Sequence, residues 1–227
     1  MNSEVENLTL EQTVDDVLQH AELLEPIEKG MKDGSDWIDV LTDLRKILSE
    51  FCANIESLEN VISHLPDSGF IVGIQWAGVI AAYEGFIHDF FDLLLKNEIH
   101  ATKALEKFRV QKDFKKYRHQ IFKRNNENRT ITIDDIRKQF SEMTFNNPYY
   151  GVEFANLLFD LSIPTINFSE MKNAIAIRNA YIHKNGCLEV SVTELRQFLE
   201  RIDQIVADFT NKLYCQASTT YLNEIEN

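Results

Sequence analysis

The scarcity of chain breakers limits what this sequence can fold into more than any other feature. Only 8 glycines and 4 prolines occur in 227 residues, so few positions favour the turns that a β-rich architecture needs. Apolar residues instead recur at helical spacing along most of the chain, as Leu195, Phe198 and Ile202 do near its end. The sequence therefore predicts an all-α fold with long helices.

The predicted helices divide into an acidic N-terminal part and a larger C-terminal part. We expect domain limits at 1–66, an acidic helical extension, and at 67–227, a helical domain. The extension holds two helices separated at Lys32–Asp36. The second part begins with an apolar helix over 70–95 and a basic helix over 101–124. Two short helices follow, one from Ile133 that is capped by Thr132 and one over 152–161. The last two helices are one that is capped by Ser169 and ends at Asn185–Gly186, and a final one that begins with the capping box of Ser191 and Glu194.

Charge is unevenly distributed along the chain. The net charge is −13, which alone argues against nucleic acid as a partner, but residues 101–138 hold 12 Lys/Arg against 5 Asp/Glu. Screening confines the field of such a segment to about 8–10 Å, so it can still bind phosphate on an acidic body. We expect its aromatic residues to form a core face; a nucleic-acid stripe is the alternative. The candidate RNA-binding residues are Lys112, Lys115, Lys116, Arg118, Lys123 and Arg124.

Several features predict a soluble, cytoplasmic protein without a membrane partner, metal or cofactor. The longest charge-free run, Ser68–Tyr83, has 16 residues, fewer than the ~20 that cross a bilayer. The N-terminus lacks the pattern of a signal peptide, and the three cysteines are odd in number and far apart. No phosphate-binding glycine loop, HExxH motif or cysteine pair occurs.

The stretch IRNAYIHKNG (Ile177–Gly186) gathers side chains suited to phosphate chemistry. Arginine makes forked contacts to phosphate, and histidine acts as a general acid or base near neutral pH. Such groups suit metal-independent RNA cleavage, in which the ribose 2′-hydroxyl attacks the neighbouring phosphate. On an ideal helix, Asn179 and His183 share a face, whereas Arg178 and His183 point about 140° apart. Convergence then needs the reach of arginine, unwinding at the helix end, or a second copy across a dimer axis.

A purely structural interpretation competes with this one. Histidines near a helix C-terminus commonly do no more than interact with the last carbonyl groups. An Arg-x4-His spacing is also short enough to arise by chance. The motif therefore supports a catalytic hypothesis without deciding it.

The wider context resembles the HEPN superfamily. The motif helix, AIRNAYIHKNG, matches the Arg-x4–6-His motif of that superfamily, with asparagine directly after the arginine, and an amphipathic helix follows it. The earlier apolar segment GVIAAYEGFIHDFFDLLL resembles the first HEPN helix, with its aromatic-Glu pair at Tyr83-Glu84. The resemblance covers about residues 70–214 and is greatest with stand-alone bacterial HEPN ribonucleases of toxin and phage-defence loci.

This resemblance implies a HEPN-like helical bundle and a metal-independent endoribonuclease that acts as a homodimer on RNA. Arg178 would bind phosphate, His183 would be the general acid/base, and Asn179 would orient them. Glu84 and His88 are supporting candidates, with a structural role as the alternative. An antitoxin, such as a small nucleotidyltransferase, is the implied partner. A non-catalytic HEPN-like module that binds protein or nucleotide, and an acidic scaffold working through the first two helices, remain open alternatives.

Overall fold

The computed structural model describes residues 10–65, 69–125, 129–184 and 189–225. Within these ranges the chain forms α-helices and one short 3-10 helix, with no strand, which confirms the predicted all-α class. The elements are α1 (Leu10–Ile62), α2 (Phe70–Lys96), α3 (Glu98–Val110), η1 (Lys112–Phe114), α4 (Lys115–Asn125), α5 (Ile133–Ser141), α6 (Pro148–Phe159), α7 (Phe168–His183) and α8 (Val192–Ile225).

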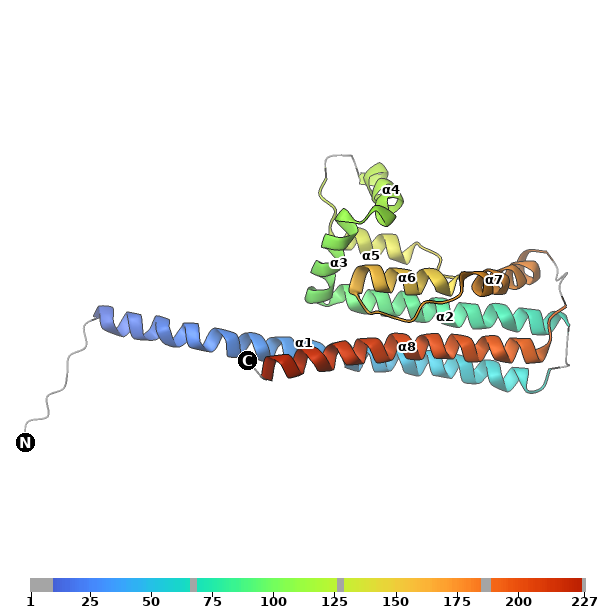
Figure 1. Cartoon of the computed structure of the whole chain (residues 1–227), viewed down its shortest axis with the longest axis horizontal. Coiled ribbons are helices and arrows are strands. Elements are labelled where there is room, and N and C mark those ends of the chain that lie inside the picture. The colour runs from blue at the N-terminus through green and yellow to red at the C-terminus, as the bar shows by residue number, and fades with distance from the viewer. Residues whose placement is uncertain (1–9, 66–68, 126–128, 185–188, 226–227) are drawn as a thin grey trace, which may run out of the picture.

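Helix α2 lies at the centre of the bundle. The long helices α1 and α8 run along one side of it, and the shorter α5, α6 and α7 lie along the other side (Figure 1). Helix α3 crosses one end, and α4 lies on the side away from α1 and α8 (Figure 1). Since α2 packs against α1, α3, α5, α6, α7 and α8, it holds the two sides of the bundle together.

The burial of α2 explains its apolar composition. Of its 27 residues 13 are buried, among them Tyr83, Phe90 and Leu94, which are fully enclosed. Among the described helices, α2 is the one long and apolar enough to cross a membrane by length and composition. A helix that is apolar on every side is equally suited to the core of a helical protein. Its position inside the bundle confirms the predicted buried helix and is compatible with a soluble protein.

The N-terminal segment differs from the prediction. A break was expected at Lys32–Asp36, but α1 continues from Leu10 to Ile62. A glycine inside a helix costs only about 1 kcal/mol, and helix extension is cooperative once a neighbouring segment is helical. The first part of α1 extends beyond the other helices (Figure 1).

The second part of α1 belongs to the same core as the rest of the chain. Its buried residues line one face of the helix at spacings of three, four or seven: Trp37, Val40, Leu44, Phe51, Ile55 and Ile62. They pack towards α2 and α8. The core is therefore continuous across residue 66, and a division into two domains there stays a prediction.

The basic segment also differs from the single helix that was predicted. It forms α3, η1 and α4, because Gln111 adopts an extended conformation that ends α3. Arg118 donates to the backbone carbonyls of Phe108 and Gln111, which satisfies acceptors that a helix end leaves unpaired. The expected aromatic core face is confirmed, since Phe108 and Phe114 are buried and stack with ring centroids 4.9 Å apart.

The predicted N-terminal capping residues are right in two cases and wrong in one. Thr132 and Asp135 form a reciprocal capping box at α5, and Ser191 and Glu194 bond in the same way at α8. Ser169 does not cap α7, because the side chain of Asn167 accepts from the amides of Ser169 and Glu170 instead. All eight predicted core residues of α8 are buried: Leu195, Phe198, Leu199, Ile202, Ile205, Val206, Phe209 and Leu213.

Two glycines of α2 provide a direct test of this packing. A methyl group on Gly73 would lie 2.3 Å from ring atoms of Tyr181, whereas one on Gly85 would meet no atom within 4 Å. Gly73→Ala is therefore expected to lower the free energy of unfolding by about 1–3 kcal/mol through overpacking. Gly85→Ala should raise it by about 0.5–1 kcal/mol, because alanine favours a helix. Urea denaturation measures both, and equal effects would contradict the close approach of α2 and α7.

Candidate active site

Helix α7 presents the motif on a firmly packed element. Its inner face consists of small and apolar residues that are buried: Met171, Ala174, Ile177, Ala180 and Tyr181. This face packs on α2, where the absence of a side chain at Gly73 admits the ring of Tyr181. The helix ends at His183, after which the amide of Lys184 bonds to the carbonyl of Ala180. The motif thus occupies the last two turns of a helix whose position the core determines.

The structure brings the three motif side chains together within one chain. Arg178 Nη1 donates to Asn179 Oδ1 at 2.9 Å, and the same nitrogen lies 3.5 Å from His183 Nε2. The 140° difference in direction is therefore overcome by the length of the arginine side chain. Unwinding of the helix and a second copy, the other two routes to convergence, are not needed for this contact.

The contact between Arg178 and His183 has a defined direction. A guanidinium group can only donate hydrogen bonds, so in this contact Nε2 of His183 is the acceptor. At 3.5 Å the bond is at its outer limit and gives way readily to a better partner. Arg178 and Asn179 are half-buried and His183 is exposed, so a ligand can reach all three.

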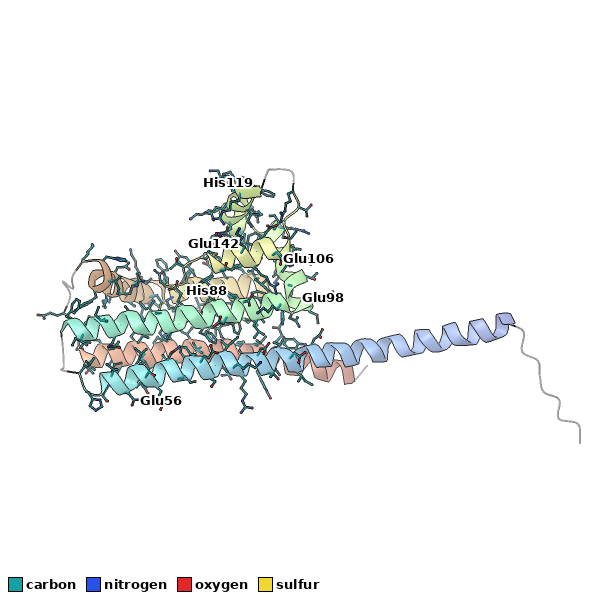
Figure 2. All side chains as sticks on the ribbon, turned by 180° about the vertical axis from the view of Figure 1, so that it is seen from behind. Glu56, His88, Glu98, Glu106, His119 and Glu142 are labelled. Carbon is teal, nitrogen blue, oxygen red and sulfur yellow. The ribbon has the colours of Figure 1, made fainter. Side chains whose placement is uncertain are left out.

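Glu84 and His88 lie in a different environment. Glu84 Oε1 accepts from the buried backbone amide of Phe145 at 2.9 Å, and the ring of Phe145 meets His88 edge to face at 5.3 Å. No hydrogen bond or ion pair joins Glu84 to Arg178 among the described residues. Both side chains therefore fix the segment that leads into α6, on the side of α2 where His88 is labelled in Figure 2. The geometry fits the structural alternative for this pair.

The six basic candidates fall into two groups. Arg118 bonds to the end of α3, and Arg124 forms an ion pair with Glu142, the residue directly after α5, which is labelled in Figure 2. Both arginines therefore support the position of α4. The remaining four are lysines with exposed side chains on η1 and α4: Lys112, Lys115, Lys116 and Lys123.

An exposed apolar patch next to the motif was not predicted from the sequence. We define the apolar patch as Phe70, Ile71 and Ile74 on the first turns of α2 together with Ile182 on the last turn of α7. The first two and Ile182 are 54%, 53% and 45% exposed. The two helix ends meet where Phe70 contacts the ring of Tyr181, with centroids 5.9 Å apart. The sequence could not distinguish these residues, because apolar side chains occupy every side of α2.

Metal-ligating side chains are not gathered anywhere in the described ranges. No group of three or more histidine, cysteine, aspartate or glutamate residues there is placed to hold a metal ion. Cys52 and Cys215 lie exposed on α1 and α8. Cys187 lies outside the described residues.

No family model, curated protein or solved structure matches this chain significantly. The resemblance to the HEPN superfamily therefore remains a proposal, carried by the motif and by the order of the helices.

The structural role of Glu84 can be separated from a catalytic one. Glu84→Ala leaves the buried amide of Phe145 without an acceptor, so we expect a loss of about 1–3 kcal/mol in the free energy of unfolding. Glu84→Gln keeps a side-chain oxygen and should lose less than half of that. Denaturation monitored by circular dichroism measures the difference. Equal stability of Glu84→Ala and the unchanged protein would mean that the bond to Phe145 contributes nothing.

Proposed function

We propose that this protein is a metal-independent endoribonuclease of the HEPN type, with Arg178, Asn179 and His183 as its catalytic residues. The observation that carries the proposal is the contact of Arg178 with both Asn179 and His183 at the exposed end of α7. A phosphate group that pairs with Arg178 would take the place of His183 at the guanidinium. Nε2 of His183 would then be available next to the bound phosphate.

The proposed reaction needs proton transfers at two oxygen atoms. The ribose 2′-oxygen forms a bond to phosphorus while the bond from phosphorus to the 5′-oxygen of the next nucleotide breaks. A base accepts the proton of the 2′-hydroxyl, and an acid gives a proton to the departing 5′-oxygen. Arg178 stabilises the negative charge that builds up on the phosphate oxygens. The products are a 2′,3′-cyclic phosphate and a free 5′-hydroxyl.

A homodimer supplies both proton-transferring groups in this scheme. Each chain contributes one motif histidine, so two copies facing one cleft provide a base and an acid. The apolar patch supports this arrangement, because exposed apolar residues next to a functional site commonly mark a protein interface. A two-fold axis near Ile182 would place both histidines at the same interface.

The cellular setting follows from the HEPN resemblance. It implies a cytoplasmic toxin or phage-defence enzyme, held in check by an antitoxin such as a small nucleotidyltransferase. The exposed lysines of η1 and α4 would guide RNA by their charge, an attraction that weakens as salt concentration rises. Loss of cleavage at high salt without loss of fold would accord with that role.

Cleavage by matched histidine variants tests the function. Purified wild type, His183→Ala and His119→Ala are incubated with total RNA and with tRNA in EDTA, and products are resolved on a denaturing gel. We expect cleavage by the wild type, at least a 100-fold loss in His183→Ala as for removal of a general acid or base, and near-normal cleavage by His119→Ala. His119 is the control because it is an exposed helical histidine on α4, far along the chain from the motif.

Each other outcome has a definite meaning. Equal cleavage by wild type and His183→Ala would remove the catalytic roles of Arg178, Asn179 and His183. No cleavage by any of the three, with folding and dimer content matched, would favour the non-catalytic binding module.

The dimer is tested by placing a charge in the apolar patch. Ile182→Asp should convert a dimer into a monomer, because a carboxylate buried in an apolar interface is costly, while the exposed position leaves the fold intact. Thr193→Asp, an exposed substitution on α8, serves as the control. Sedimentation velocity measures the state of both. A monomeric wild type, or a dimeric Ile182→Asp, would show that the patch is not the dimer interface.

A further inference from the structure

A cavity lies between α6 and the segment that leads into α7. Its volume of about 210 Å³ is smaller than the 300–1,000 Å³ typical of pockets for larger ligands and suits a single planar ring system. Its lining combines aromatic, apolar and polar side chains: Tyr149, Val152, Glu153, Asn156, Leu157, Thr165 and Ile166.

Tyr149, which lines this cavity, belongs to a cluster of three aromatic rings. Tyr149 contacts Phe168 with ring centroids 5.1 Å apart, and it contacts Tyr150 at 5.7 Å. Tyr150 is 42% and Phe168 43% exposed, and the three rings meet one another edge to face. Exposed aromatic rings are the surfaces on which proteins stack the bases of single-stranded RNA, at about 1–3 kcal/mol per base.

Glu153 is the polar group in the cavity that can select a ligand. The amide of Asn156 is already engaged, since its nitrogen donates to the carbonyl of Ile163 at 2.9 Å and its oxygen accepts from the amide of Ile163 at 2.7 Å. Glu153 is half-buried; burial and then the nearby charge of Asp113 raise the pKa of its carboxyl group, and a hydrogen bond from the side chain of Tyr149 opposes that rise. In its ionised form this carboxylate only accepts hydrogen bonds, so it favours a ligand that offers donors to it.

The cavity lies between the basic segment and the catalytic motif. Tyr117 of α4 packs edge to face on Phe154 of α6, with centroids 5.6 Å apart, and it follows directly after Lys115 and Lys116. From the other side of the cavity, α7 leads from Phe168 to Arg178 over about 15 Å. Helix α6, which lines the cavity, therefore contacts both the basic helix α4 and the motif helix α7.

We propose that this cavity binds a guanine base of single-stranded RNA, stacked on the ring of Tyr149 and hydrogen-bonded to the carboxylate of Glu153. The inference rests on the proposed function and adds base specificity to it. Guanine is the base whose Watson–Crick edge offers two adjacent N–H donors, which match the two oxygens of a carboxylate. Adenine and cytosine offer one donor beside an acceptor, and uracil offers one donor between two acceptors. The enzyme should therefore cut at a fixed distance from a guanosine.

Binding tests the inference independently of cleavage. The full chain carrying His183→Ala is titrated against short fluorescein-labelled RNAs rich in uridine, with one central guanosine, adenosine or cytidine. We expect about tenfold tighter binding of the RNA that contains guanosine, because one bidentate contact to a base discriminates by about this factor. Adding Glu153→Gln should remove this preference, whereas adding Glu106→Gln, an exposed glutamate of α3 labelled in Figure 2, should leave it unchanged.

The outcomes distinguish this inference from the proposed function. Equal affinity for all three RNAs, or a guanosine preference that survives Glu153→Gln, would overturn the guanine site even if the wild type cleaves RNA. A preference that depends on Glu153, in a protein that never cleaves RNA, would support the guanine site in a binding module. Where the wild type does cleave, mapped ends at a constant spacing from guanosine support it further, and ends without such spacing overturn it.

Discussion

The packing of Tyr181 against Gly73 is the contact on which the candidate site depends. A side chain at residue 73 would occupy the space of the tyrosine ring, so this glycine lets α7 lie directly on the central helix. Because α2 contacts helices on both sides of the bundle, the position of α7 is tied to the whole core. The last turn of α7 is thereby held at the surface, where Arg178 and His183 can meet both each other and a ligand.

The long side chain of Arg178 brings the three motif residues together at the end of α7. Arg178 reaches Asn179 and His183 from a direction that an ideal helix would point away from the histidine. The resulting trio is small, exposed and bordered by apolar residues on α2 and α7. These properties suit a site completed by a second copy of the chain, in which each protomer supplies one histidine and one arginine.

The sequence predicts repeating patterns well and individual contacts poorly. Periodicity identified the core face of α8, and capping residues located the starts of α5 and α8, because both depend on local spacing. The continuity of α1 and the interruption after α3 were missed, since they depend on packing and on the bonds that Arg118 makes to distant carbonyls. The contact of Arg178 with His183 could not be predicted, because it depends on the direction of the arginine side chain, which the sequence does not give. The exposure of Phe70 and Ile71, and the cavity at Glu153, require the tertiary fold.

The chemistry of the RNA ends tests the central claim most directly. A short RNA that the protein cuts at one site is compared with the same RNA carrying a single 2′-deoxy nucleotide on the 5′ side of that site. Mass spectrometry identifies the ends of the products. Attack by the 2′-hydroxyl predicts 2′,3′-cyclic phosphate ends and no cleavage at the deoxy position. Cleavage at that position, or products with a 3′-hydroxyl and a 5′-phosphate, would contradict the mechanism assigned to Arg178, Asn179 and His183.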